Sequence, residues 1–175
     1  WVDNFHGLFG VNEVAMWIGI PFTILLIMFV INAVNLIDGI DGLASGLSIV
    51  AMVVYGLLFT YLGDNGQALV AFSLVGCLIA FFYYNVRGFS NKTIKIFMGD
   101  TGSLTIGFIL SLLSLKIVTI PASGIVWSYD PLVVAFAPLM IPCLDVIRVF
   151  FHRIRCKRNP FLPDNNHIHH KILAL

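Results

Sequence analysis

Residues 14–34 read VAMWIGIPFTILLIMFVINAV, and residues 35–42, which follow directly, read NLIDGIDG. The first string has no charged residue and is as long as the ~20 residues that a helix needs to cross a bilayer. The second string carries two carboxylates. Since lipid cannot satisfy free backbone polar groups, an apolar run of this length predicts a membrane-spanning helix. That helix is expected to end at a water-facing acidic turn.

Four more apolar runs follow, over Leu43–Leu62, Gln67–Tyr84, Gly102–Ile120 and Pro131–Phe150. Only 11% of the 175 residues are charged, against roughly 25% in soluble domains, so a soluble fold could not cover its surface. The sequence therefore predicts an all-α, polytopic integral membrane helical bundle with about five transmembrane helices, in which residues 1–175 form a single membrane domain. Kinks are expected at three prolines, Pro21, Pro138 and Pro142.

The cations predict the orientation of these spans. Five crossings place segments 35–42, 85–101 and 151–175 on one side of the membrane, and segments 1–13, 63–66 and 121–130 on the other. Nine of the ten Lys and Arg residues lie in or beside the first set, and none lies in the second; the nine are Arg87, Lys92, Lys95, Arg148, Arg153, Arg155, Lys157, Arg158 and Lys171. Because cytoplasmic loops carry an excess of Lys and Arg, the first set is predicted to be cytoplasmic. Residues 151–175 would then form a cytoplasmic basic and histidine loop.

The first cytoplasmic segment holds Asn35, Asp38 and Asp41. Two aspartates three residues apart share a face of a helix, and the glycine after each lets a ligand or backbone approach closely. The alternative is that one aspartate only caps the helix that begins near Leu43. A cap needs one carboxylate, however, so the second favours a functional site.

The second segment contains Asp100 within the string FMGDTGSL, residues 97–104, directly before the fourth span. Helix capping and function explain this residue about equally well when it is taken alone. A third carboxylate on the same side of the membrane favours function, because Mg²⁺ is bound by one or two carboxylates together with substrate phosphates.

The third segment holds three histidines, His167, His169 and His170, after the basic run 153–158. Imidazole N–H groups beside Arg158 and its neighbours are suited to donate hydrogen bonds to phosphate oxygens. Zinc binding is an alternative for the histidines. The basic run itself is interpreted first as a topological anchor that faces anionic lipid. Within the last span, Asp145 is predicted to pair with Arg148.

Three strings together resemble one enzyme family: NAVNLIDGIDGLASG at 32–46, FMGDTGSL at 97–104 and PFLPDNNHIHH at 160–170. Their order and spacing are similar to those of the polyprenyl-phosphate N-acetylhexosamine-1-phosphate transferases, of the glycosyltransferase family 4 type. The resemblance covers nearly the whole chain.

This resemblance implies a bacterial enzyme of the inner, cytoplasmic membrane that faces the cytoplasm and transfers a sugar 1-phosphate from a UDP-sugar to undecaprenyl phosphate. UMP would be released, and Mg²⁺, or Mn²⁺ in its place, would be required. By motif, Asp100 corresponds to the metal ligand. Asn35, Asp38 and Asp41 correspond to the acidic motif that contacts the nucleotide, and His169 and His170 to a motif that contacts the substrate phosphates. His167 and Arg158 are further expected substrate contacts, and a homodimer is left open.

Two departures from the family pattern shape the expectation. The family carries an adjacent pair of aspartates on an earlier loop and further spans at both ends, and this chain has neither. We therefore expect the chain to be an internal fragment that is inactive alone. The order His-Ile-His-His after Pro-Asp-Asn resembles the branch that transfers N-acetylglucosamine 1-phosphate or a related sugar in O-antigen, common-antigen or teichoic-acid synthesis. Asn165 replaces the usual Arg, which leaves the sugar open. The alternative branch is the phospho-N-acetylmuramoyl-pentapeptide transferase of peptidoglycan synthesis.

Two other classes of protein compete with the enzyme. A transporter usually has its carboxylates at the middle of the membrane, whereas these lie at span ends. A purely structural subunit leaves the clustered acids and histidines unexplained. The lipid bilayer is the expected setting, and no nucleic acid is expected as a partner.

Overall fold

The computed structural model describes residues 1–2, 13–87, 95–119 and 131–155, and these form helices joined by short turns. Five helical segments are long and apolar enough to cross a membrane, which confirms the predicted all-α membrane fold. The elements are α1 (Met16–Ile37), α2 (Leu43–Tyr61), α3 (Asn65–Arg87), α4 (Gly99–Val118), α5 (Pro131–Phe136), the 3₁₀ turn η2 (Ala137–Leu139) and α6 (Met140–Arg155).

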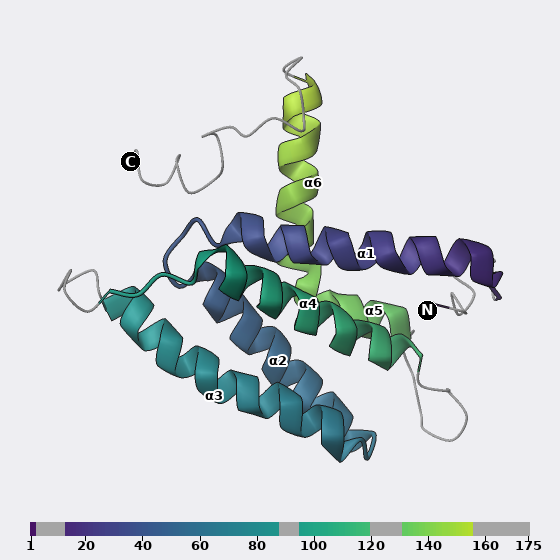
Figure 1. Ribbon diagram of the computed structural model, residues 1–175, viewed down its shortest axis with the longest axis horizontal. Helices are drawn as coiled ribbons and strands as arrows, with labels where there is room; N and C mark the ends of the chain where they lie inside the picture. The colour runs from purple at the N-terminus through teal and green to yellow at the C-terminus, as the bar shows by residue number, and fades with distance from the viewer. Residues whose placement is uncertain (3–12, 88–94, 120–130, 156–175) are drawn as a thin grey trace.

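Four helices form the bundle that carries the candidate site. The most extensive packing joins α2 to α3 and α1 to α4, and Figure 1 shows these four helices with α5 beside α4. The C-terminal ends of α1 and α3 and the N-terminal ends of α2 and α4 lie toward the same end of the bundle (Figure 1). This arrangement brings segments 35–42 and 95–100 together, as the expected five crossings require.

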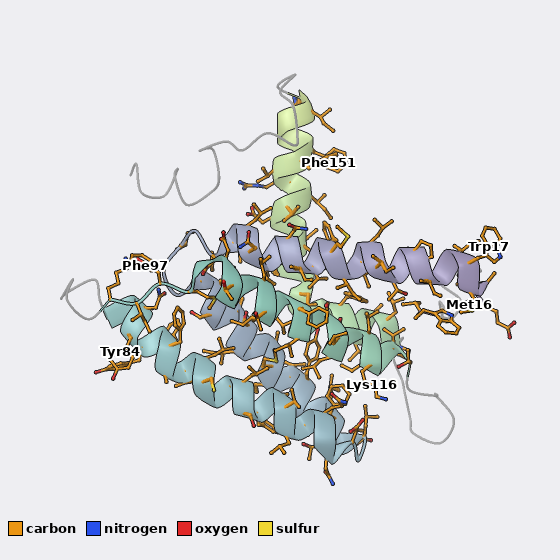
Figure 2. All side chains as sticks on the ribbon, viewed as in Figure 1. Met16, Trp17, Tyr84, Phe97, Lys116 and Phe151 are labelled. Atoms are coloured by element: carbon orange, nitrogen blue, oxygen red, sulfur yellow. The ribbon has the colours of Figure 1, made fainter. Side chains whose placement is uncertain are left out.

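The core of the bundle is filled by large side chains of α2 and α4. Met52, Tyr55 and Phe59 are buried along α2, and the hydroxyl of Tyr55 donates a hydrogen bond to the Ala135 carbonyl at 2.6 Å. Most outward-facing side chains are also apolar. Trp17 on α1 and Phe151 on α6 point away from the bundle (Figure 2) and are exposed. Helices that are apolar on all faces are those that lipid surrounds.

The fifth span is broken into α5, η2 and α6. Pro138 lies in the 3₁₀ turn that separates the two helices, where its missing N–H interrupts the α-helical hydrogen bonds, as predicted. Pro21 and Pro142 lie inside α1 and α6. Beyond the break, α6 crosses α1 and leads away from the other helices (Figure 1). Asp145 and Arg148 form the predicted ion pair on α6, with 3.7 Å between Oδ1 and Nε.

Candidate active site

The acidic turn between α1 and α2 is formed by residues 38–42. Helix α1 ends at Ile37, and the Asp38 N–H donates to the Asn35 carbonyl at 3.2 Å. Gly42 is the N-cap of α2 and has a φ of 78°, which glycine adopts without strain. No side chain caps α2 through a hydrogen bond. The capping explanation for Asp38 and Asp41 is therefore wrong.

Asp100 lies in the first turn of α4, two positions after the N-cap residue Met98, and no side chain caps this helix either. The positive end of the helix dipole favours a carboxylate at this position. Gly99, with a φ of 65°, makes the bend that leads into the helix. Asp100 itself is exposed and accessible to a ligand.

Asn35 joins α1 to the start of α4. Its Nδ2 donates to Ser103 Oγ at 2.8 Å and to Asp100 Oδ1 at 3.3 Å. The two helices approach closely further along, where a Cβ built on Gly107 would lie 2.9 Å from the Cα of Ile31. The acidic segments were predicted to share one side of the membrane, and the fold brings Asn35 into contact with Asp100, 65 positions away in sequence.

Asp38 lies where negative charge accumulates. The pKa of its carboxyl group is raised from 3.8 to about 6, mainly by partial burial and in addition by the neighbouring carboxylates of Asp100 and Asp41. All three predicted acids therefore belong to one electrostatic site. A bound cation would relieve this repulsion.

Among the described residues, Asp41 forms an ion pair with Lys95, and no such pair is seen there for the other two acids. Lys95 Nζ lies 2.6 Å from Asp41 Oδ2, and both side chains are about four-fifths buried, with 21% and 24% exposed. The same ammonium group lies 4.7 Å from the centre of the Phe97 ring, which is itself 73% exposed. Asp41 is thereby held against the segment that leads into α4.

Three residues of the site were not assigned to it from the sequence. In the sequence, Lys95 is one of nine cations that indicate topology, Asn85 is the first residue of the predicted cytoplasmic segment 85–101, and Ser103 belongs to a motif without a role of its own. Asn85 and Ser103 are almost fully buried. The signal that could have found Asn85 and Ser103 is a polar residue at the end of an apolar run.

The donors present fit a divalent cation bound with substrate. Asp38 and Asp100 offer hard carboxylate oxygens, the ligands that Mg²⁺ prefers. Within the described residues, no three His, Cys, Asp or Glu side chains form a cluster that could hold a metal alone. Mg²⁺ is commonly bound by one or two carboxylates, and substrate phosphates complete its coordination.

An apolar pocket lies beside the acidic turn. It is lined by residues of α1, α2, α4, η2 and α6, among them Ile37, Ala44 and Leu139. Ile37 immediately precedes Asp38, so the pocket adjoins the charged site.

The residues predicted from the basic and histidine loop cannot be compared with these acids. Arg158, His167, His169 and His170 lie outside the described residues. Their predicted contacts with substrate phosphates stay predictions.

Comparisons with known proteins give the family. The model of "Glycosyl transferase family 4" matches residues 2–118. An Escherichia coli K12 protein named undecaprenyl-phosphate alpha-N-acetylglucosaminyl 1-phosphate transferase is 32% identical over 99% of this chain and 46% of its own length. A Yersinia pestis protein of the same name is 36% identical over 89% of this chain and 41% of its own length. A Bacillus subtilis protein with a "probable" name of this kind is 34% identical over 90% of this chain and 41% of its own length.

The chain spans about half the length of these curated relatives. No solved structure matches it significantly. The family match includes both described acidic segments, in which Asn35, Asp38, Asp41 and Asp100 come together. On the strength of this match over most of its length, the chain belongs to glycosyl transferase family 4.

Proposed function

We propose that the protein transfers an N-acetylhexosamine 1-phosphate, N-acetylglucosamine 1-phosphate in the first place, from a UDP-sugar to undecaprenyl phosphate and releases UMP. The reaction would begin the synthesis of a cell-envelope polysaccharide. The observation that carries the proposal is the meeting of Asn35, Asp38 and Asp100 at one end of α1 and α4. The names of the relatives support the acceptor and the sugar phosphate.

The reaction joins two anions, and the site is suited to that task. An oxygen of the lipid phosphate forms a bond to the phosphorus that carries the sugar, and the bond from this phosphorus to the UMP oxygen breaks. A lipid phosphate is already ionised at pH 7, so it needs little help from a base. Lowering the repulsion between the reactants is the larger requirement.

Asp38 and Asp100 are the residues that would hold Mg²⁺, or Mn²⁺ in its place. When bound, the ion supplies positive charge to the pyrophosphate and to the leaving UMP. Asn35 orients the Asp100 carboxylate through its 3.3 Å hydrogen bond. Lys95 balances the charge of Asp41, which leaves Asp38 and Asp100 as the carboxylates to meet the ion.

The basic and histidine loop would contact the substrate. Hydrogen bonds to the substrate phosphates would come from Arg158, His167, His169 and His170. The active site faces the cytoplasm, in accordance with the cation distribution of the sequence. A transporter is disfavoured because the carboxylates lie at helix ends, not at the middle of a broken helix.

The test is a UMP-release assay on the full-length protein, reconstituted with undecaprenyl phosphate. UDP-N-acetylglucosamine, UDP-N-acetylgalactosamine and UDP-N-acetylmuramoyl-pentapeptide form the donor panel. We expect release with the first donor, loss with EDTA and recovery with Mg²⁺ or Mn²⁺. UMP release only with the pentapeptide donor would place the protein in the peptidoglycan branch. If none of the three donors gives UMP release, the proposed activity is contradicted.

A further inference from the structure

Asn85 occupies an unusual position for a polar residue near the end of a membrane-spanning helix. It lies in the last turn of α3, and only 5% of it is exposed. Its Oδ1 accepts a hydrogen bond from the Gly42 N–H at 2.6 Å, and its Nδ2 donates to the Ile96 carbonyl at 2.8 Å. One side-chain amide therefore binds two segments that are more than fifty positions apart in sequence.

These two segments carry the acids of the site. Gly42 follows Asp41 in the turn before α2. Ile96 follows Lys95 in the segment that leads to Asp100. The amide of asparagine offers both an acceptor and a donor. An aspartate at this position would keep only the acceptor, and a leucine would keep neither.

The acidic turn is also seated directly on α3. A Cβ built on Gly42 would lie 2.6 Å from Cγ2 of Val86 and 3.1 Å from Cε2 of Phe82, both of α3. The backbone of the turn thus contacts the same helix end from which Asn85 reaches it. The Asp41–Lys95 ion pair closes a second link between the two segments.

We propose that Asn85 is a positioning residue of the transferase site, which fixes the turn at 38–42 relative to the segment at 95–100. It acts through Gly42 and Ile96, and this inference rests on the proposed function. Because a displacement of about 1 Å between reacting groups can lower a rate roughly 100-fold, loss of this link should reduce turnover strongly.

The experiment compares Asn85→Leu, Asn85→Asp and Asn65→Leu in the full-length protein. Asn65 is exposed in the first turn of the same helix, so its replacement by leucine is a matched control. For each variant, kcat and KM are measured for UDP-N-acetylglucosamine and for undecaprenyl phosphate. Folded protein is quantified by size-exclusion chromatography and thermal melting in detergent.

We expect kcat per folded molecule to fall about 100-fold in Asn85→Leu, with little change in the KM for undecaprenyl phosphate. Asn85→Asp should retain more activity than Asn85→Leu, because it keeps the acceptor for the Gly42 N–H. Asn65→Leu should match the wild-type protein. If Asn85→Leu yields no folded protein, the kcat of Asn85→Asp against wild type decides the question.

Unchanged kcat per folded molecule in the Asn85 variants would overturn the positioning role, even if their melting temperatures fall. In that case an active wild-type enzyme would leave the proposed function standing. An inactive wild-type enzyme across the donor panel would instead remove the proposed function, and the positioning role with it.

Discussion

The ammonium group of Lys95 lies 2.6 Å from the carboxylate of Asp41, a residue 54 positions earlier in the chain. The pair ties the entrance of α4 to the entrance of α2. Since both side chains are mostly buried, removing Lys95 takes away a positive charge that offsets the cost of burying the Asp41 carboxylate.

Replacing Lys95 with methionine is therefore expected to lower kcat about tenfold, by roughly 1.4 kcal/mol of transition-state stabilisation. Lys95→Arg should restore much of the activity, because it keeps the charge. Lys116 is exposed at the opposite end of α4, so Lys116→Met is the matched control and should leave kcat unchanged. The UMP-release assay measures all three, and equal rates in Lys95→Met and wild type would show that the ion pair is dispensable.

Asp100→Asn tests the metal role of this residue. The change preserves size, and Asp100 makes no side-chain cap in α4. A lost dipole interaction should cost at most about 1 kcal/mol of stability. We expect most of the activity to disappear while the melting temperature changes little. Isothermal titration with Mn²⁺ should show weaker binding, and full activity in this variant would exclude Asp100 as the essential ligand.

The pH dependence should report the state of Asp38. Its carboxyl group has a pKa of about 6 in place of 3.8, so the carboxylate is lost as the pH falls through 6. Activity that needs the carboxylate should fall with it. Because Mg²⁺ competes with the proton, a higher Mg²⁺ concentration should move this acid limb to lower pH. If the pH at which activity falls does not change with the Mg²⁺ concentration, Asp38 does not bind the metal.

The pH dependence of stability should be opposite to that of activity, because protonation of Asp38 favours the folded protein. A raised pKa means that the folded protein binds the proton more tightly than the unfolded chain does. The contribution of Asp38 to stability is therefore present below pH 3.8 and is lost as the pH rises through 6. Asp38→Asn should remove this part of the pH dependence, as measured by thermal melting across the range.

Gly107 should be sensitive to a single added methyl group. A Cβ there would lie 2.9 Å from the Cα and 3.3 Å from the carbonyl oxygen of Ile31, and a backbone cannot turn aside as a side chain can. Gly107→Ala should destabilise the protein by about 1–3 kcal/mol and separate α1 from α4. Gly76→Ala on α3, where a Cβ meets nothing within 4 Å, is the control. A Gly107→Ala protein as stable as the control would contradict this packing.

The orientation of the spans can be tested by thiol labelling in intact cells, in a Cys77→Ser background because Cys77 is exposed. Cys156 should be protected from a membrane-impermeant reagent, and a cysteine in place of Asp64 should react. The converse pattern would reverse the topology and with it the predicted cytoplasmic face.

The sequence was sufficient to predict the spans because apolar length alone decides what crosses a bilayer. The expected first span, 14–34, differs from α1 by only a few residues at each end. The packing was harder to predict. Helices with lipid-facing apolar surfaces show no polar side to mark the inward face, so the pairing of α1 with α4 through Gly107 left no periodic signal in the sequence.

The acids of the site were predictable and their supports were not. Asp38, Asp41 and Asp100 stood out because carboxylates are costly near lipid. Lys95 looked like one topological cation among nine, and only the fold places it against Asp41. Asn85 acts through hydrogen bonds to backbone groups, and the identities of Gly42 and Ile96 give no hint of that partnership.

The attachment of both acidic segments to the end of α3 has a mechanical consequence. Much of α3 faces outward, and only 17% of its apolar stretch is buried, so this helix is among those most directly in contact with the acyl chains. A thicker or thinner bilayer changes the tilt of such a helix. Because the same helix end contacts Gly42 and, through Asn85, Ile96, we expect a tilt to move both segments together. The spacing between the two groups of carboxylates should then depend little on the lipid composition of the membrane.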